Sequence, residues 1–251
     1  MMAGNPFRGA GYLLRGAGML NTPGLRTFVL IPLLVNVLLF TGAIWLLVDQ
    51  FDVWMAYWMG QLPEWMSFLD WLLWPLFAVV VLVLVYYSFT LVANFIAAPF
   101  NGLLAEKVEL RLRGKTNGEE GWQAALKMVP QALGRELSKL RYYLPRFLFI
   151  LILTFIPGIN LLAPLLWFMF GAWMMSIQYC DYPMDNNRVS FTQMKQLLKS
   201  HRLTALGFGG LVQLGMLIPV VNLILMPTAV VGATIYWVEE YADEQDLLAE
   251  H

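Results

Sequence analysis

The chain has 251 residues, of which 59% are hydrophobic and 13% charged, with a mean hydropathy of +0.62 and a formal net charge of −1. This composition excludes an ordinary water-soluble globular domain, and the balanced charge gives no indication of a nucleic-acid partner. One cysteine, Cys180, excludes an intrachain disulfide framework, and two histidines offer little for a metal site, so we expect no metal and no cofactor. The composition indicates an all-α integral membrane protein, which we interpret as a single membrane domain over residues 1–251.

Two long apolar runs predict transmembrane helices at about 28–48 and 71–95. Each holds about 20 or more residues without a charged side chain, enough at about 1.5 Å per residue to cross roughly 30 Å of hydrocarbon. Pro32 and Pro75 fall in or near the first turns of these runs, where a missing backbone donor costs little.

The segment at about 100–145 predicts a cytoplasmic helical region. Within it, GEEGWQAALKMVPQALGRELSKLRYYL places apolar residues at three- and four-residue spacing, with charged residues elsewhere around the helix. The apolar positions are Trp122, Leu126, Val129, Leu133, Leu137 and Leu140. This pattern is typical of an amphipathic helix, which either lies on the membrane surface, packs on a neighbouring subunit or caps the bundle.

Two further apolar runs, at about 147–179 and 203–238, are too long for one helix and too short for two comfortable crossings. Each is cut by Ile-Pro-x-x-Asn; the residues at these breaks are Pro157, Asn160, Pro219 and Asn222. Proline removes a backbone donor, and asparagine is a good N-cap, so we expect a helix to restart at each asparagine. Each run predicts a broken, partly penetrating helical hairpin.

The distribution of basic residues predicts the orientation. Lysine and arginine are absent from residues 49–70 and frequent in the N-terminal segment, in 100–146 and in 180–202. The positive-inside rule then places both termini in the cytoplasm and the 49–70 loop outside. Both broken runs begin and end on the cytoplasmic side, so each must turn around at its proline.

The repeated breaks have two interpretations. Irregular backbone at membrane depth is tolerated only inside protein or against water, which favours a polar permeation route lined by the breaks. Proline, glycine and asparagine are also ordinary turn formers, so tight surface loops would use the same residues and line nothing.

The stretch NTPGLRTFVL has the composition of an anion site. Asn21 or Thr22 is placed to cap a helix that starts at Pro23, Gly24 lets a ligand approach the backbone, and Arg26 adds a forked donor. A tetrahedral oxyanion suits such a helix start. The alternative is a juxtamembrane arginine that only satisfies the positive-inside rule.

Enzymatic chemistry is not expected. The sequence lacks a phosphate-binding loop, a zinc-protease motif, a plausible Ser/His/Asp set and any cluster of carboxylates within the apolar runs. The absence of Asp, Glu and His from these runs also leaves a conventional intramembrane proton relay without carriers.

Three stretches together resemble one family. NTPGLRTFVLIPLLVN, VANFIAAPFNGLLAEKVE at 92–109 and QYCDYPMDNNRVSF at 178–191 are similar to the CysZ sulfate permeases of bacterial inner membranes, over about residues 8–240. The resemblance implies two long transmembrane helices plus two partly penetrating hairpins, assembled as a homo-oligomer in the lipid bilayer. It also implies ATP-independent uptake of sulfate for assimilatory reduction and cysteine biosynthesis. The family's sulfate-binding motif maps onto Gly24, Leu25 and Arg26.

The other two motifs predict structure more than ligand contact. We expect Asn94, Pro99, Asn101 and Gly102 to end the second span, and Asp181, Tyr182, Pro183 and Asp185 to form a capped turn. The family often has histidine where this chain has Asn187, which argues against proton coupling through that position. Two function classes stay open: a sulfate channel or transporter, and a membrane scaffold or assembly protein that binds sulfate or other partners without conducting.

Overall fold

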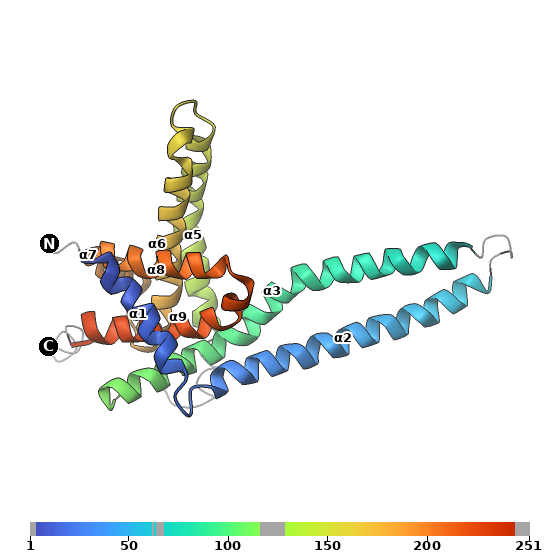
Figure 1. The fold of residues 1–251 in the computed structure, drawn as a ribbon, viewed down its shortest axis with the longest axis horizontal. Coiled ribbons are helices and arrows are strands. Elements are labelled where there is room, and N and C mark those ends of the chain that lie inside the picture. Colours follow the sequence, from blue (N-terminus) through green and yellow to red (C-terminus); the bar gives the residue numbers. More distant parts are fainter. Residues whose placement is uncertain (1–3, 62, 64–67, 116–128, 244–251) are drawn as a thin grey trace. The chain divides into compact units, whose positions relative to one another are not determined.

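The computed structural model describes residues 4–61, 63, 68–115 and 129–243, and every regular element in these ranges is helical. The all-α prediction is therefore confirmed for this part of the chain. The elements are α1 (Pro6–Leu20), α2 (Thr27–Met59), α3 (Phe68–Arg113), α5 (Val129–Thr154), η2 (Asn160–Leu162), α6 (Ala163–Asn186), α7 (Phe191–Ser200), α8 (Arg202–Met216) and α9 (Pro219–Glu240), shown in Figure 1. The chain forms two compact units, one of Leu30–Ala98 and one of Met1–Val29 with Pro99–His251.

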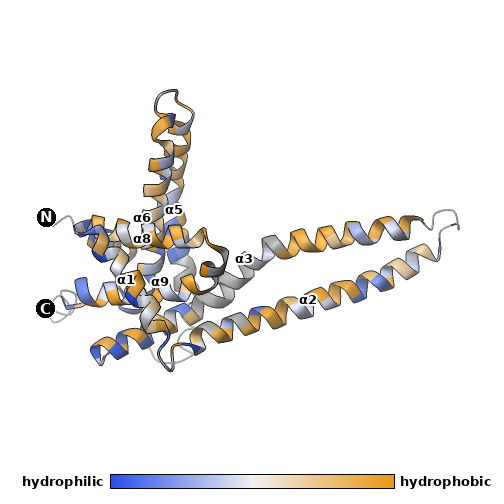
Figure 2. Ribbon diagram, viewed as in Figure 1, coloured by the Kyte–Doolittle hydropathy of each residue, from blue (hydrophilic) through white to orange (hydrophobic). Residues whose placement is uncertain are grey.

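The Leu30–Ala98 unit contains most of α2 and the first part of α3. The Leu30–Met59 helix is long and apolar enough to cross a membrane, and Trp71–Val85 is a shorter apolar stretch. Hydrophobic residues predominate along α2 in Figure 2. The Phe51 and Phe77 rings stack with centroids 3.8 Å apart, which joins the two helices. Large apolar side chains on α2 such as Trp45 and Leu38 are more than half exposed, as expected for a surface that lipid covers.

Both of these helices are longer than the apolar runs predict. α2 continues to Met59 and so includes Asp49 and Asp52, and α3 continues to Arg113. The expected end of the second span near Pro99 is wrong: the helix runs on through the good helix formers of LLAEKVELRLR. One face of this extension is fully buried, through Leu104, Ala105 and Val108. Packing of that face therefore supports the helix past its proline.

The core of the second unit forms where α1 crosses α8 and α9. A Cβ on Gly9 of α1 would lie 1.9 Å from the carbonyl oxygen of Thr204, and one on Gly16 would lie 2.6 Å from the Gly232 nitrogen. α6 and α8 approach as closely, because a Cβ on Gly209 would lie 1.8 Å from the Ala172 oxygen. Such contacts between backbones are typical of helices that pack in membranes through small residues.

α5 and α6 form one helix pair, and α8 and α9 form another, each connected at an Ile-Pro-x-x-Asn sequence. In the first pair, Gly158 adopts a φ of +86° in the turn between the helices. The Trp167 indole donates across the pair to the Thr154 hydroxyl at 3.1 Å. Figure 1 shows both pairs as antiparallel neighbours.

The asparagines do not begin the second helix of either pair. α6 begins at Ala163, after the short η2 turn that starts at Asn160, and its N-cap Leu162 makes no side-chain cap. α9 begins at Pro219, so Asn222 lies inside the helix. The predicted asparagine caps are wrong: a proline, with its fixed φ and no N–H to satisfy, occupies the first turn of each helix, Pro164 in α6 and the motif residue Pro219 in α9.

The amphipathic segment and the first arm of the first hairpin form one helix. α5 runs without a break through Pro145, so the boundary predicted between 145 and 147 is absent. At about 1.5 Å per residue, its 26 residues measure about 39 Å. The predicted apolar positions Trp122 and Leu126 lie outside the described residues.

Candidate functional site

The turn between α1 and α2, residues Asn21–Arg26, contains the predicted anion site. It is a series of turns rather than the start of α2: Asn21 is the C-cap of α1, and α2 begins only at Thr27. The expectation that Asn21 or Thr22 caps a helix starting at Pro23 is therefore wrong. The Thr22 hydroxyl instead donates to the Met19 carbonyl at 2.8 Å, which closes α1.

Gly24 and Leu25 have different places in this turn. Gly24 is exposed with a φ of +90°, and a Cβ there would meet no atom within 4 Å. Glycine is thus required by the left-handed conformation and not by crowding. Leu25 is only 4% exposed and its N–H donates to the Thr22 carbonyl at 3.3 Å. Its side chain anchors the turn in the core, while the glycine backbone faces outward.

The Arg26 side chain is exposed, and two hydrogen bonds to Asn21 fix its orientation. Its Nε donates to the Asn21 carbonyl at 3.1 Å, and its Nη2 donates to the Asn21 side-chain oxygen at 2.7 Å. These bonds use one edge of the guanidinium, and the donors on Nη1 have no acceptor among the described residues. The backbone N–H groups of Gly24, Arg26 and Thr27 likewise find no acceptor in the part of the chain that the structure describes.

A second guanidinium reaches the turn from α3. Arg111 Nη1 lies 3.4 Å from the Thr22 hydroxyl oxygen, although the two residues are 89 positions apart. Arg111 was not among the predicted site residues. Two arginines and several free N–H groups at one exposed turn match the donors that a tetrahedral dianion needs.

The end of α3 that carries Arg111 is held by a buried polar cluster. Glu109 is fully buried and accepts from Arg113 at 2.8 Å, Asn187 at 2.7 Å and the Trp237 indole at 3.4 Å. These partners come from α3, the end of α6 and α9. Asn187 is thus a neutral donor to a buried carboxylate, a role that the sequence did not reveal. The cluster fixes the helix end behind the turn.

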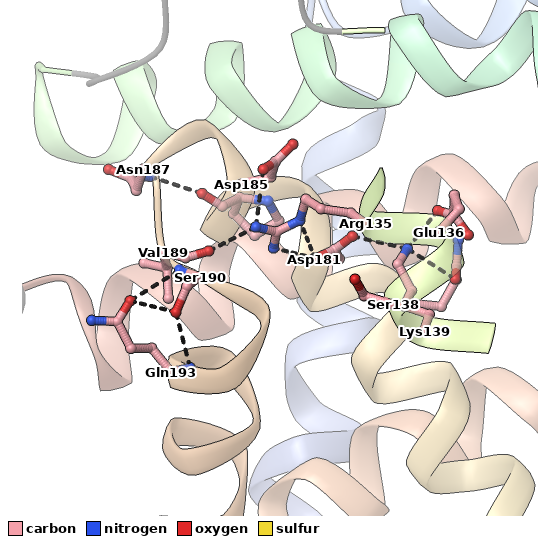
Figure 3. A network of polar contacts seen from close by, with 12 residues as sticks. Arg135, Glu136, Ser138, Lys139, Asp181, Asp185, Asn187, Val189, Ser190 and Gln193 are labelled. Atoms are coloured by element: carbon pink, nitrogen blue, oxygen red, sulfur yellow. Dashed lines mark hydrogen bonds and ion pairs between the residues drawn. The ribbon is translucent and has the colours of Figure 1, made fainter. Parts of the chain in front are cut away.

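A second buried cluster joins α5 to the end of α6 (Figure 3). Arg135 donates from Nε to Asp181 at 3.0 Å and from Nη1 to the Val189 carbonyl at 2.8 Å, and Nη1 also lies 3.1 Å from Asp185. Lys139, 2% exposed, lies 2.8 Å from Asp181 and 2.6 Å from Glu136. Burial alone would lower the pKa of Lys139, but Asp181 and Glu136 outweigh it and raise the pKa above its ordinary value.

The second cluster corrects two sequence predictions. Asp181, Tyr182, Pro183 and Asp185 lie inside α6, not in a turn after it. α6 is part of the apolar helix Asn160–Asn186, which is long enough to cross a membrane. The apolar runs are free of carboxylates, but the helices built from them are not. The partners of Asp181 are two basic residues of α5, so the cluster is an assembly contact between helices.

The first hairpin break, unlike the Asn21–Arg26 turn, is flanked by exposed apolar side chains. Pro157 and Asn160 are exposed, and the flanking Phe155 and Leu161 are 78% and 82% exposed. Within the described part of one protomer, the first break therefore lines no enclosed path. The backbone of Pro219 and Asn222 lies in the first turns of α9.

One buried amide lies between the two pairs. The Gln213 side chain of α8 packs against Gly171 of α6, where an added Cβ would lie 2.6 Å from Nε2. Its Oε1 is buried without a hydrogen-bond partner among the described residues. A buried amide oxygen normally has a partner, so this atom departs from the usual pattern. The described residues contain no group of three or more His, Cys, Asp or Glu side chains arranged to hold a metal ion.

Comparison with known proteins supports the sequence resemblance. The family model described as sulfate transporter CysZ/etoposide-induced protein 2.4 matches residues 12–227. A protein named sulfate transporter CysZ from Pseudomonas syringae pv. tomato is 51% identical over 233 residues, which cover 92% of each chain. Its namesake from Pseudomonas aeruginosa strain LESB58 is 48% identical over 237 residues, covering 94% of this chain and 96% of the relative.

Proposed function

The chain belongs to the sulfate transporter CysZ/etoposide-induced protein 2.4 family, and we propose on this basis that it takes up sulfate across the bacterial inner membrane. The sulfate supplies assimilatory reduction and cysteine biosynthesis, and transport is channel-like and independent of ATP. The observation that carries this proposal is the near-complete match to relatives named sulfate transporters, together with the donor-rich turn at Gly24–Arg26.

Sulfate binds at the turn, in this proposal, through the outward backbone of Gly24, the free edge of Arg26 and the guanidinium of Arg111. Leu25 contributes by anchoring the turn through its buried side chain. Sulfate is a strongly hydrated dianion, so entering a site costs hydration free energy. Forked guanidinium donors and unpaired backbone N–H groups replace part of the lost hydration shell without a covalent step.

The chain crosses the membrane at α2 and α3, with the α5–α6 and α8–α9 pairs entering from the cytoplasmic side. Ion pairs between Arg8 and Glu240 at 3.0 Å and between Arg15 and Glu239 hold α1 against the end of α9, so these helices share one side of the membrane in this proposal. Both terminal helices then lie on the same, cytoplasmic, side. The exposed apolar break at 155–162 is covered by lipid or by another copy in a homo-oligomer.

The route beyond the turn passes, in this proposal, along the helix pairs. The breaks at Pro157, Asn160, Pro219 and Asn222 set where each pair turns around. The unpaired amide oxygen of Gln213, on the contact between α6 and α8, supplies a polar group beside that route. Since the first break is exposed in one protomer, any path it lines is completed by a neighbouring copy.

Sulfate-dependent thermal stabilisation tests the binding step. A ligand bound only by the folded state adds RT ln(1 + [L]/Kd) to stability, so the melting temperature of the purified protein should rise with sulfate. Arg26→Ala should abolish the rise and Arg111→Ala should weaken it. Arg202→Ala is the matched control, because Arg202 is exposed and distant in sequence from the turn, and it should respond like the unmodified chain. An unaltered response of Arg26→Ala would refute the assignment.

A further inference from the structure

Six basic residues of the Pro99–His251 part of the chain have two kinds of surroundings. Arg113, Arg135 and Lys139 lie within ion-pair distance of carboxylates. Arg146, Lys195 and Lys199 have no carboxylate within that distance among the described residues. These three residues come from α5 and α7, and no carboxylate among the described residues neutralises their charge.

Arg146 and Lys195 lie over the same aromatic ring. The guanidinium carbon of Arg146 is 3.6 Å from the centroid of the Tyr142 ring, and Lys195 Nζ is 5.0 Å from it. Lys195 Nζ is also 4.7 Å from the Phe191 ring centroid. The Trp173 indole donates to the Tyr142 hydroxyl at 3.1 Å, which fixes the ring. Two cations are therefore held at defined positions on an aromatic base.

Lys199 extends this surface along α7. Met194 and Leu198 are fully buried on the inner face of α7, and Lys199 follows Lys195 by one helical turn on the same outer face. On α5, Phe147 and Leu148 continue from Arg146 and are 41% and 46% exposed. The charged surface thus adjoins an exposed apolar surface. This arrangement is characteristic of the boundary between headgroups and hydrocarbon.

We propose that Arg146 and Lys195, with Lys199 beside them, bind the phosphate of an anionic phospholipid. A lipid phosphate at that boundary would meet a guanidinium with free N–H donors and two ammonium groups, while its acyl chains would cover Phe147 and Leu148. Charge complementarity and the adjoining apolar surface together favour a lipid over a soluble anion. The inference uses only the proposed entry of α5–α6 into the bilayer and is independent of sulfate conduction.

Lipid titration of the purified full chain tests this site. Binding of phosphatidylglycerol and of zwitterionic phosphatidylcholine would be measured by native mass spectrometry in a neutral detergent. We expect phosphatidylglycerol to bind preferentially, with affinity reduced about fivefold in Lys195→Gln and about twenty-fivefold in Arg146→Gln/Lys195→Gln, from the usual contribution of a basic residue near an anionic surface. Lys195→Arg keeps the charge and should bind like the unmodified chain.

Lys107→Gln is the matched control, since it removes one exposed positive charge on α3 and leaves the basic residues of α5 and α7 unchanged. It should leave phosphatidylglycerol binding unchanged. Equal binding of this lipid by the double variant and the unmodified chain would overturn the proposal, as would equal binding of the two lipids. Displacement of the lipid by millimolar inorganic phosphate would show that the surface binds free anions instead. Sulfate-dependent stabilisation, measured on the same samples, separates this outcome from a failure of the Arg26 site.

Discussion

The two helix pairs share the Ile-Pro-x-x-Asn break and differ in how they are held. The α8–α9 pair lies in the core, where Phe208, Val212 and Ala233 are fully buried. The α5–α6 pair exposes most of its apolar side chains near the turn, including Phe149 and Ile152 at 63% and 62%. The same motif therefore gives two different connections: residues 155–162, with the η2 turn, join α5 to α6, whereas only residues 217–218 separate α8 from α9.

The means of attachment differ accordingly. Glycine contacts let α8 and α9 approach α1 and α6 until backbones touch, as at Gly209. α5 instead packs mainly on α6, and at its base Arg135 and Lys139 pair with Asp181. We infer that close packing determines the position of the second pair and buried ion pairs determine that of the first. The substitutions below test either the buried ion pairs or the close packing.

Asp181→Asn should have the largest effect, at the base of the first pair. It leaves the buried cations of Arg135 and Lys139 without their shared carboxylate, which typically costs about 3–5 kcal/mol. The melting temperature in detergent measures the loss. Glu136→Gln removes an exposed partner of the same lysine and should cost less than about 1 kcal/mol. Equal effects of the two changes would contradict a buried role for Asp181.

Gly209→Ala should separate α8 from α6. Its Cβ would lie 1.8 Å from the Ala172 oxygen, so the helices must move apart, at a cost of about 3 kcal/mol. The yield of monodisperse protein and its melting temperature are the measurements. Gly11→Ala on α1 meets no atom within 4 Å and serves as the control, with unchanged or slightly raised stability. A tolerated Gly209→Ala would mean that close packing does not hold the second pair.

Gly158→Ala should have a smaller cost in the exposed turn of the first pair. No atom lies within 4 Å of the added Cβ, so only the φ of +86° is penalised, by about 1 kcal/mol. The comparison of melting temperatures with Gly209→Ala separates backbone strain from steric contact. If Gly158→Ala proved the more harmful of the two, the turn would have to be covered in the functional assembly.

The smallest effect is a pH dependence at the contact between α1 and α9. Hydrogen bonds from Arg15, at 3.0 and 2.5 Å, hold the pKa of Glu239 below its ordinary value of 4.5. The carboxylate is more acidic when folded, so its contribution is present above pH 4.5 and is lost as the pH falls through the folded pKa. The pair is exposed, and solvent screening limits it to about 0.5 kcal/mol. Melting curves between pH 3 and 7 should therefore differ slightly between the unmodified chain and Glu239→Gln, and identical profiles would assign the pair no stability.

Much of the architecture was predictable because it depends on local signals. Apolar runs identified the long helices, and proline marked both breaks. The predictions failed where packing overrides local preference. α3 passes Pro99 because its next residues are buried in the core, and proline rather than asparagine occupies the first turn of α6 and α9.

The site was predictable only in part, for a related reason. Gly24 to Arg26 form a contiguous motif, whereas Arg111 reaches Thr22 across 89 positions and Arg135 reaches Asp181 across 46. A single sequence carries no signal for such long-range pairs. The basic residues of α3 and α5 are equally consistent with unpaired charges on a cytoplasmic surface. The role of Asn187 likewise depends on a distant residue, because its partner Glu109 lies 78 positions away.

Uptake of labelled sulfate into proteoliposomes tests the central proposal most directly. The unmodified protein and Arg26→Ala would be compared at equal incorporation, with and without an imposed pH gradient. We expect flux that Arg26→Ala abolishes and that the gradient leaves unchanged. Flux that persists in Arg26→Ala would contradict the site at the α1–α2 turn, and the absence of flux from the unmodified protein would contradict conduction itself and favour a membrane scaffold.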